Sequence, residues 1–174
     1  RQFCQTVLFH YFAGILNEFG SRGTITGSTA WPSANRAIFL PLFIPAPVLI
    51  SKLFWVNGST VNAAYNLDIG LYAFNEADPI SVVRLVSSGT TAQGTASVRQ
   101  TADITDTVIG RGTYYIALAC DNVLATVQGS TVGTAVTTAL AGFAMIDAGF
   151  PLPATGTLVT VATSFSVFVG AQAA

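Results

Sequence analysis

The side chains of this sequence that could carry out chemistry are few and widely spaced. His10 is the only histidine, and a catalytic triad built on it needs the N-terminal segment to fold onto a distant serine or thiol. One histidine and two widely separated cysteines, Cys4 and Cys120, cannot supply the four ligands of a structural zinc site. We expect His10 to be solvated or packed against another subunit, and both cysteines to be reduced thiols without a disulfide.

Paired carboxylates are the remaining route to hydrolytic chemistry, as in glycosidases. Asp103 and Asp106 are close in sequence, but they fall in a stretch that we interpret as a turn, where aspartate accepts local backbone hydrogen bonds. Asp68 falls in the middle of a predicted strand. On an outer sheet face it could form a cross-strand ion pair with Lys52 or Arg84, and the alternative is a calcium or sugar contact.

Two further patterns bear on ligand binding. Asn75, Glu76 and Asp78 form a small polar cluster without the carboxylate spacing of an EF-hand. Gly110 and Gly112 precede a predicted strand rather than a helix, so they do not form a phosphate-binding loop. We predict neither a catalytic site, nor a metal site, nor a cofactor.

Four aromatic residues of the predicted strands and loops are candidates for a binding surface, namely Trp31, Trp55, Tyr72 and Tyr115. For each ring, packing against the core or against another subunit is favoured over stacking on a ligand. We predict that Trp31, Trp55 and Tyr72 contribute to a subunit interface.

The elements that position these side chains are predicted to be β-strands from residue 24 onward. The hydrophobic period there is two, and glycine, asparagine, aspartate and proline interrupt the chain at short intervals. We expect strands over residues 48–56, 65–73, 80–86, 114–120 and 158–169, an edge strand over 96–105 and a hairpin partner of 114–120 over 123–127. Residues 129–149 have no firm period and are expected to be irregular.

Two of these strands differ in their alternation. Residues 48–56 are apolar on both faces and end at the turn signal Asn57-Gly58. Residues 65–73 place Asp68 and Tyr72 opposite an apolar face, as in a half-solvated antiparallel strand. About eight strands with long crossovers fit a jelly roll better than a meander, so we predict an antiparallel, jelly-roll-like β-sandwich domain over residues 24–174.

The first 23 residues follow a different pattern. Apolar residues at four-residue steps place one stripe on a predicted helix, namely Phe3, Val7, Tyr11, Ile15 and Phe19. Gly20 and Gly23 end it. We interpret residues 1–23 as an amphipathic N-terminal arm, with the stripe contacting a neighbouring subunit. The alternative is that Glu18-Phe19-Gly20-Ser21 marks a linker introduced by cloning.

The amino-acid composition is unusually apolar for a soluble domain. Charged residues make up 9% of the chain, against about a quarter in an ordinary soluble domain, and 51% of its residues are hydrophobic. The longest apolar run is interrupted by Pro41, Pro45 and Pro47, so we expect no membrane span. The seven basic residues are scattered along a chain of net charge −1, which argues against nucleic-acid binding. We expect other subunits to bury part of the surface.

Several short motifs occur in a recognisable order. They are WPSANRA at 31–37, FWVNG at 54–58, DIGLY at 68–72, LVSSGTTAQ at 85–93 and GTYYIAL at 112–118. With this order, residues 24–127 resemble β-sandwich virion proteins of tailed bacteriophages, a loosely defined group in which similar strand and turn motifs recur. The later run Phe150-Pro151-Leu152-Pro153 also fits the resemblance, whereas the arm does not.

The resemblance implies an exterior, non-enzymatic component of a phage particle that assembles in the host bacterial cytoplasm. Its expected partners are further copies of itself, as a homotrimer, and the major capsid protein or other virion proteins. The low charge and the apolar arm favour a capsid decoration or cement subunit. A tail-fibre or tailspike component that binds a host receptor or glycan is the alternative, and a hydrolase based on Asp68, Asp103 and Asp106 is the least supported.

Overall fold

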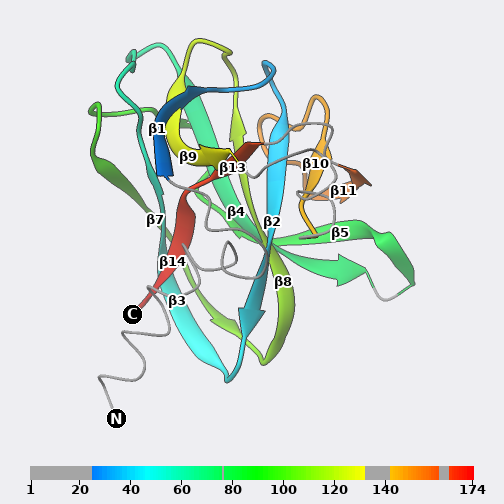
Figure 1. The fold of residues 1–174 in the computed structure, drawn as a ribbon. Helices are drawn as coiled ribbons and strands as arrows, with labels where there is room; N and C mark the ends of the chain where they lie inside the picture. Colours follow the sequence, from blue (N-terminus) through cyan, green and yellow to red (C-terminus); the bar gives the residue numbers. More distant parts are fainter. Residues whose placement is uncertain (1–24, 76, 132–141, 161–164) are drawn as a thin grey trace.

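The computed structural model describes residues 25–75, 77–131, 142–160 and 165–174 (Figure 1). The predicted arm, with its stripe Phe3, Val7, Tyr11, Ile15 and Phe19, lies outside the described residues, and so do His10 and Cys4. Every strand pairing in the described part is antiparallel. The predicted all-β, antiparallel class is confirmed.

The strands belong to three sheets. The largest contains, in spatial order, β11 (Thr155–Thr157), β5 (Asp78–Ser87), β4 (Asn66–Asn75), β8 (Gly112–Cys120), β2 (Ala37–Ile44), β10 (Ala144–Ile146) and β12 (Val159–Thr160), with β6 (Thr91–Ala92) paired to β4. The second contains β1 (Ile25–Ala30), β9 (Thr126–Thr131) and β13 (Phe165–Val167). The third contains β14 (Val169–Ala173), β3 (Val48–Val56) and β7 (Arg99–Ile109).

The large sheet curves into a nearly closed barrel of seven strands, β11-β5-β4-β8-β2-β10-β12, in which the two end strands β11 and β12 follow each other in the chain. The β14-β3-β7 sheet packs against one face of the large sheet, with contacts from β3 to β4, from β14 to β8 and from β7 to β5. An isolated bridge between Asn57, which follows β3, and Val127 of β9 joins this sheet to the small β1-β9-β13 sheet. The jelly-roll order of strands stays a prediction.

The alternation along β2 shows why the molecule has two hydrophobic cores. Ile38, Leu40 and Leu42 belong to the main core, whereas Ala37 and Phe39 belong to a second, smaller core. Because successive side chains of a strand point to opposite faces, the main core lies between the large sheet and the other two sheets, and the second core fills the seven-strand barrel of the large sheet.

The second core corrects the prediction for β4. That strand was expected to be half solvated, but Asp68, Gly70 and Tyr72 on its predicted polar face are all buried. The reason is that this face lines the barrel, which the sequence pattern did not indicate. Residues 144–158, which include β10 and β11, complete the barrel over this face, with Leu152 buried and Phe150 packed against the second core.

The sequence pattern located several other strands correctly. The expected strand 48–56 coincides with β3, and β7 is an edge strand that pairs within its sheet with β3 alone. The expected hairpin partner of β8 at 123–127 is wrong, because the Asn122 side chain turns the chain by accepting a bond from the Leu124 amide at 2.7 Å, and β9 then pairs with β1 and β13. The predicted strand 158–169 is divided into β12, β13 and the start of β14.

The C-terminal part of the chain adds short strands to all three sheets. β10 pairs with β2, β11 with β5, β13 with β9 and β14 with β3. Residues 144–173 therefore connect elements formed much earlier in the sequence. No helix among the described residues is long and apolar enough to cross a membrane.

Candidate functional site

Asp68 is the most unusual ionisable residue of the described part. It lies on β4 with 1% of its surface exposed. Its Oδ2 accepts a hydrogen bond from the Leu152 amide at 3.0 Å, and its Oδ1 accepts one from the Ser88 hydroxyl at 3.4 Å. Burial raises the pKa of Asp68, and the nearby Arg84 guanidinium and these hydrogen bonds only partly offset that increase.

The ion pairs expected for Asp68 are not the ones observed. Lys52 instead pairs with Asp103, with 3.3 Å between its Nζ and a carboxylate oxygen. Arg84 uses its Nη1 to donate a hydrogen bond to the Leu152 carbonyl. Asp68 and Arg84 therefore bind the amide and the carbonyl of the same residue.

Residues 150–157, which we call the strap, are held by β4 and β5. In addition to the two bonds at Leu152, the Tyr72 hydroxyl donates to the Pro153 carbonyl at 2.7 Å, and the Arg84 amide donates to the Ala154 carbonyl at 2.8 Å. β11, the last part of the strap, then pairs with β5. Burial raises the pKa of the Tyr72 hydroxyl, which therefore stays protonated and able to donate.

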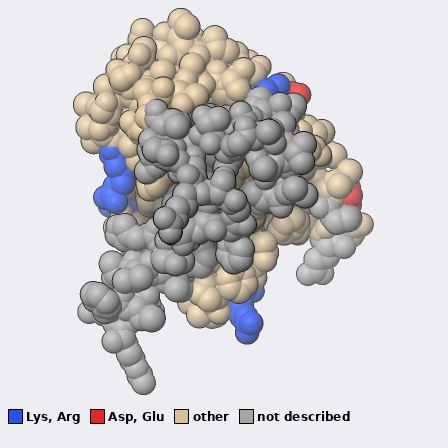
Figure 2. Space-filling model, viewed as in Figure 1, with Lys and Arg blue, Asp and Glu red and all other residues tan. Residues whose placement is uncertain are grey.

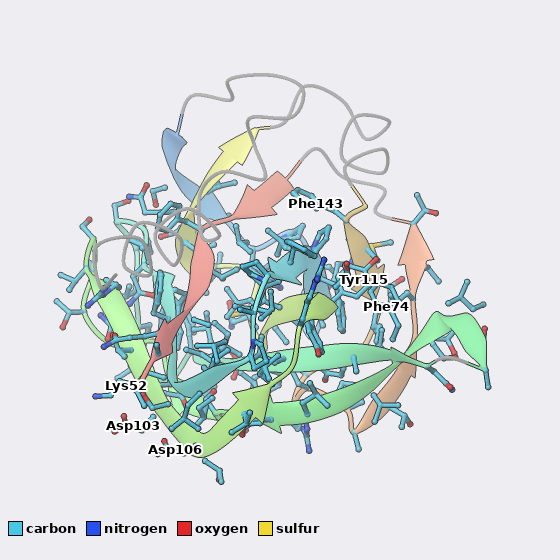
Figure 3. All side chains as sticks on the ribbon, turned by 90° about the horizontal axis from the view of Figure 1, so that it is seen from below. Lys52, Phe74, Asp103, Asp106, Tyr115 and Phe143 are labelled. Atoms are coloured by element: carbon cyan, nitrogen blue, oxygen red, sulfur yellow. The ribbon has the colours of Figure 1, made fainter. Side chains whose placement is uncertain are left out.

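The second core lies beneath this region, inside the barrel of the large sheet. Phe39 and Tyr72 contact edge to face with ring centroids 5.0 Å apart, and Phe39 contacts Tyr115 in the same way at 6.0 Å. Phe74 packs beside Tyr115 at 4.9 Å, as Figure 3 also shows. Small residues such as Ala117 let the covering segment approach the sheet closely.

Asp103 and Asp106 do not lie in a turn, contrary to expectation. They belong to the exposed edge strand β7, in a stretch where the register with β3 shifts between Ile50 and Lys52. β7 has two residues more than β3 in that interval, which is a β-bulge and explains the turn-like composition. Figure 3 shows both carboxylates beside Lys52 at one side of the molecule. The structure thus separates them from the buried Asp68 on the large sheet.

The three aromatic residues predicted at a subunit interface lie inside the chain. Trp31 and Trp55 belong to the main core and Tyr72 to the second, with 2%, 1% and 0% of their surfaces exposed. For these three rings, packing against the core of the chain is therefore the alternative that the structure supports. It leaves no exposed ring of theirs for a neighbouring subunit or for a glycan.

Asn57 is an important residue that sequence reasoning interpreted only as a turn. Its buried side chain accepts a hydrogen bond from the Trp55 indole at 2.8 Å and donates to the carbonyls of Gln93 and Thr95. The Gln93 side chain in turn donates to the Thr126 carbonyl at 2.8 Å. The sequence did contain a signal for this burial, because Asn57 directly follows a strand that is apolar on both faces.

The polar cluster at the β4–β5 turn has local partners. Asn75 accepts a bond from the Ala77 amide at 3.1 Å, and Asp78 accepts one from the Ser81 hydroxyl at 2.6 Å. Glu76 lies outside the described residues. Within the described part of the chain, no group of three or more His, Cys, Asp or Glu residues is placed to hold a metal ion.

The clearest exposed apolar feature is a set of three aliphatic side chains on β5. Ile80, Val83 and Leu85 are exposed to 56%, 40% and 41%. Ile80 and Val83 are three positions apart in a stretch that pairs regularly with β11, so they point to opposite faces of the strand. Figures 1 and 3 both show the β4–β5 hairpin extending beyond the rest of the molecule. Three such residues on a projecting hairpin are more informative than single exposed residues, which are common on soluble proteins.

The charged side chains of the described residues are few on the face shown in Figure 2, and they form small separated groups. One exposed pair joins Arg36 Nε to Asp147 at 2.7 Å, and another joins Lys52 to Asp103 at 3.3 Å.

Comparison with known proteins gives no family assignment, because no protein-family model matches the chain and no curated protein matches it either.

Proposed function

We propose that this chain is a non-enzymatic structural subunit of a bacteriophage virion, on the exterior of the particle, where it decorates and stabilises the capsid shell as a homotrimer. The observation that carries the proposal is the exposure of three aliphatic side chains, Ile80, Val83 and Leu85, on the projecting β4–β5 hairpin. Contact with another protein would remove their apolar surface from water, which favours association. The order of motifs from residue 24 to residue 127 supports the virion assignment.

The same proposal includes a jelly-roll relationship for the fold. It is supported by the antiparallel pairing and by crossovers that place β8 between β2 and β4. The partners in this proposal are further copies of the chain and the major capsid protein, with no cofactor.

The alternative, a tail-fibre or tailspike component, receives less support from these residues. A glycan site on this chain was motivated by Trp55 and Tyr72, and both rings are buried. A glycan platform needs an exposed aromatic face.

The oligomeric state tests the proposal. Light scattering coupled to size-exclusion chromatography should give three times the chain mass for the wild type. The double variant Val83→Lys/Leu85→Lys should shift toward monomer, whereas Thr101→Lys on the exposed face of β7 should not. A wild-type monomer that also fails to co-sediment with phage shells would overturn the assignment, and antibody labelling of particles in electron micrographs would separate a shell from a tail location.

A further inference from the structure

The strap is attached differently from the other strands of the barrel. Its residues Leu152 and Pro153 are held by side chains of Asp68, Tyr72 and Arg84, rather than by a continuous ladder of backbone bonds. Its one regular element, β11, has three residues, and two of them are exposed. A short edge strand of this kind is expected to separate more easily than a central strand.

The two cores are also separable. The main core between the sheets and the second core inside the barrel have no buried side chain in common. Loss of the strap therefore exposes Leu152 and part of the second core, while the main core stays packed. The free energy needed to open the strap is thus smaller than the free energy of global unfolding.

Opening of the strap changes the exposure of the Asp68 carboxylate to solvent. Its carboxylate lies buried under the strap and accepts the Leu152 amide, so departure of the strap removes that bond and lets water reach the carboxylate. The charged and titratable groups around it are Arg84 on β5 and Tyr72 on β4, while Ser88 and Gly89 contribute hydrogen bonds.

We propose that residues 150–157 open as a unit while the other strands of the large sheet and the main core stay folded, and that ionisation of Asp68 drives this opening. Hydration favours the charged carboxylate, so the open state binds the proton of Asp68 less tightly than the closed state does. Thermodynamic linkage between proton binding and opening gives the direction of the pH dependence. Because burial raises the pKa of Asp68 in the closed state, the closed state is favoured at low pH and loses that advantage as pH rises from about 4 through the closed-state value.

Hydrogen exchange measured by mass spectrometry between pH 4 and pH 8 tests this proposal. Protection factors, corrected for the intrinsic rate at each pH, are compared between peptides that cover the strap and peptides that cover β8. In the wild type, strap protection should be lower than β8 protection, and it should fall by up to about tenfold per pH unit before it levels off. The protection of β8 should not show this dependence on pH.

Three variants separate ionisation from simple loss of a contact. Asp68→Asn should remove the pH dependence of strap protection, whereas Asp103→Asn, at an exposed carboxylate, should leave it unchanged. Tyr72→Phe, which deletes the bond to Pro153 and keeps Asp68, should lower strap protection by about fivefold at every pH.

Equal protection of strap and β8, strap protection in the wild type that is independent of pH, or an unchanged pH dependence in Asp68→Asn would each overturn the proposal. If Asp68→Asn does not fold, the pH dependence of strap protection in the wild type and in Asp103→Asn still tests the proposal. None of these results depends on the oligomeric state or on binding to a shell.

Discussion

The indole nitrogen of Trp55 donates a hydrogen bond to the side-chain oxygen of Asn57, two residues further along the chain, and both side chains are buried. The amide nitrogen of Asn57 donates to the carbonyls of Gln93 and Thr95. One side chain thereby connects the end of β3 to the loop before β7, and every polar atom of that side chain has a partner.

Asn57→Asp should therefore destabilise the protein strongly. The substitution keeps the shape of the side chain but removes both donors, and it leaves a buried charge facing two carbonyl oxygens. We expect the free energy of unfolding to fall by about 3 kcal/mol or more, measured by urea denaturation. The matched control is Asn62→Asp, at an exposed asparagine that acts as an acceptor for the Ala64 amide and should tolerate the change. Equal urea midpoints for the two variants would contradict the buried network.

Gly58→Ala should also destabilise the fold, for a steric reason. A Cβ at this position would lie 2.3 Å from the Ser28 hydroxyl and 2.4 Å from the Thr126 hydroxyl, which is far inside normal contact distance. We expect a loss of about 1–3 kcal/mol. Gly110→Ala is the control, because the nearest atom to its Cβ would be 3.7 Å away. The idea fails if both variants melt at the same temperature.

Asp68→Asn should change how global stability depends on pH. Burial raises the pKa of Asp68 in the folded state, so the stability that it contributes is fully present below its ordinary value and is lost as pH rises through the folded value. The wild type should therefore lose stability between pH 4 and neutral pH relative to Asp68→Asn. Thermal melts of both proteins across this range measure the difference, with Asp103→Asn as the exposed control. A constant gap between the wild-type and Asp68→Asn curves would argue against a buried, titrating carboxylate.

Cys120 should be unreactive in the folded protein. Its thiol is fully buried on β8, donates to the Asn122 carbonyl at 3.3 Å, and has its pKa raised by burial to about 11. The thiolate is the reactive form, so Ellman's reagent at pH 8 should label Cys120 only after denaturation. The experiment uses a Cys4→Ser background so that one thiol is counted. Rapid labelling of the native protein would contradict the burial of this strand.

The alternation of apolar and polar residues located those strands in which each face is either buried or exposed along its whole length. β3 was located because residues 48–56 are apolar throughout, and β7 because its outward positions are polar. The environment of Asp68 could not be predicted in this way, because its cover is made of strands of two or three residues, too short to show a period. The same holds for Asp103 and Asp106, because a bulge inside a strand has the composition of a turn.

The position of β14 has a consequence for synthesis. This strand pairs with β3 and contributes Val169 and Ala171 to the main core, so that core stays incomplete until residues 169–173 have left the ribosome. Until then a nascent chain keeps the free edge of β3 and part of the apolar main core exposed, while aggregation and chaperone binding compete with folding. Completion of the β14-β3-β7 sheet is therefore expected to follow the translation of β14 rather than to accompany the synthesis of β3.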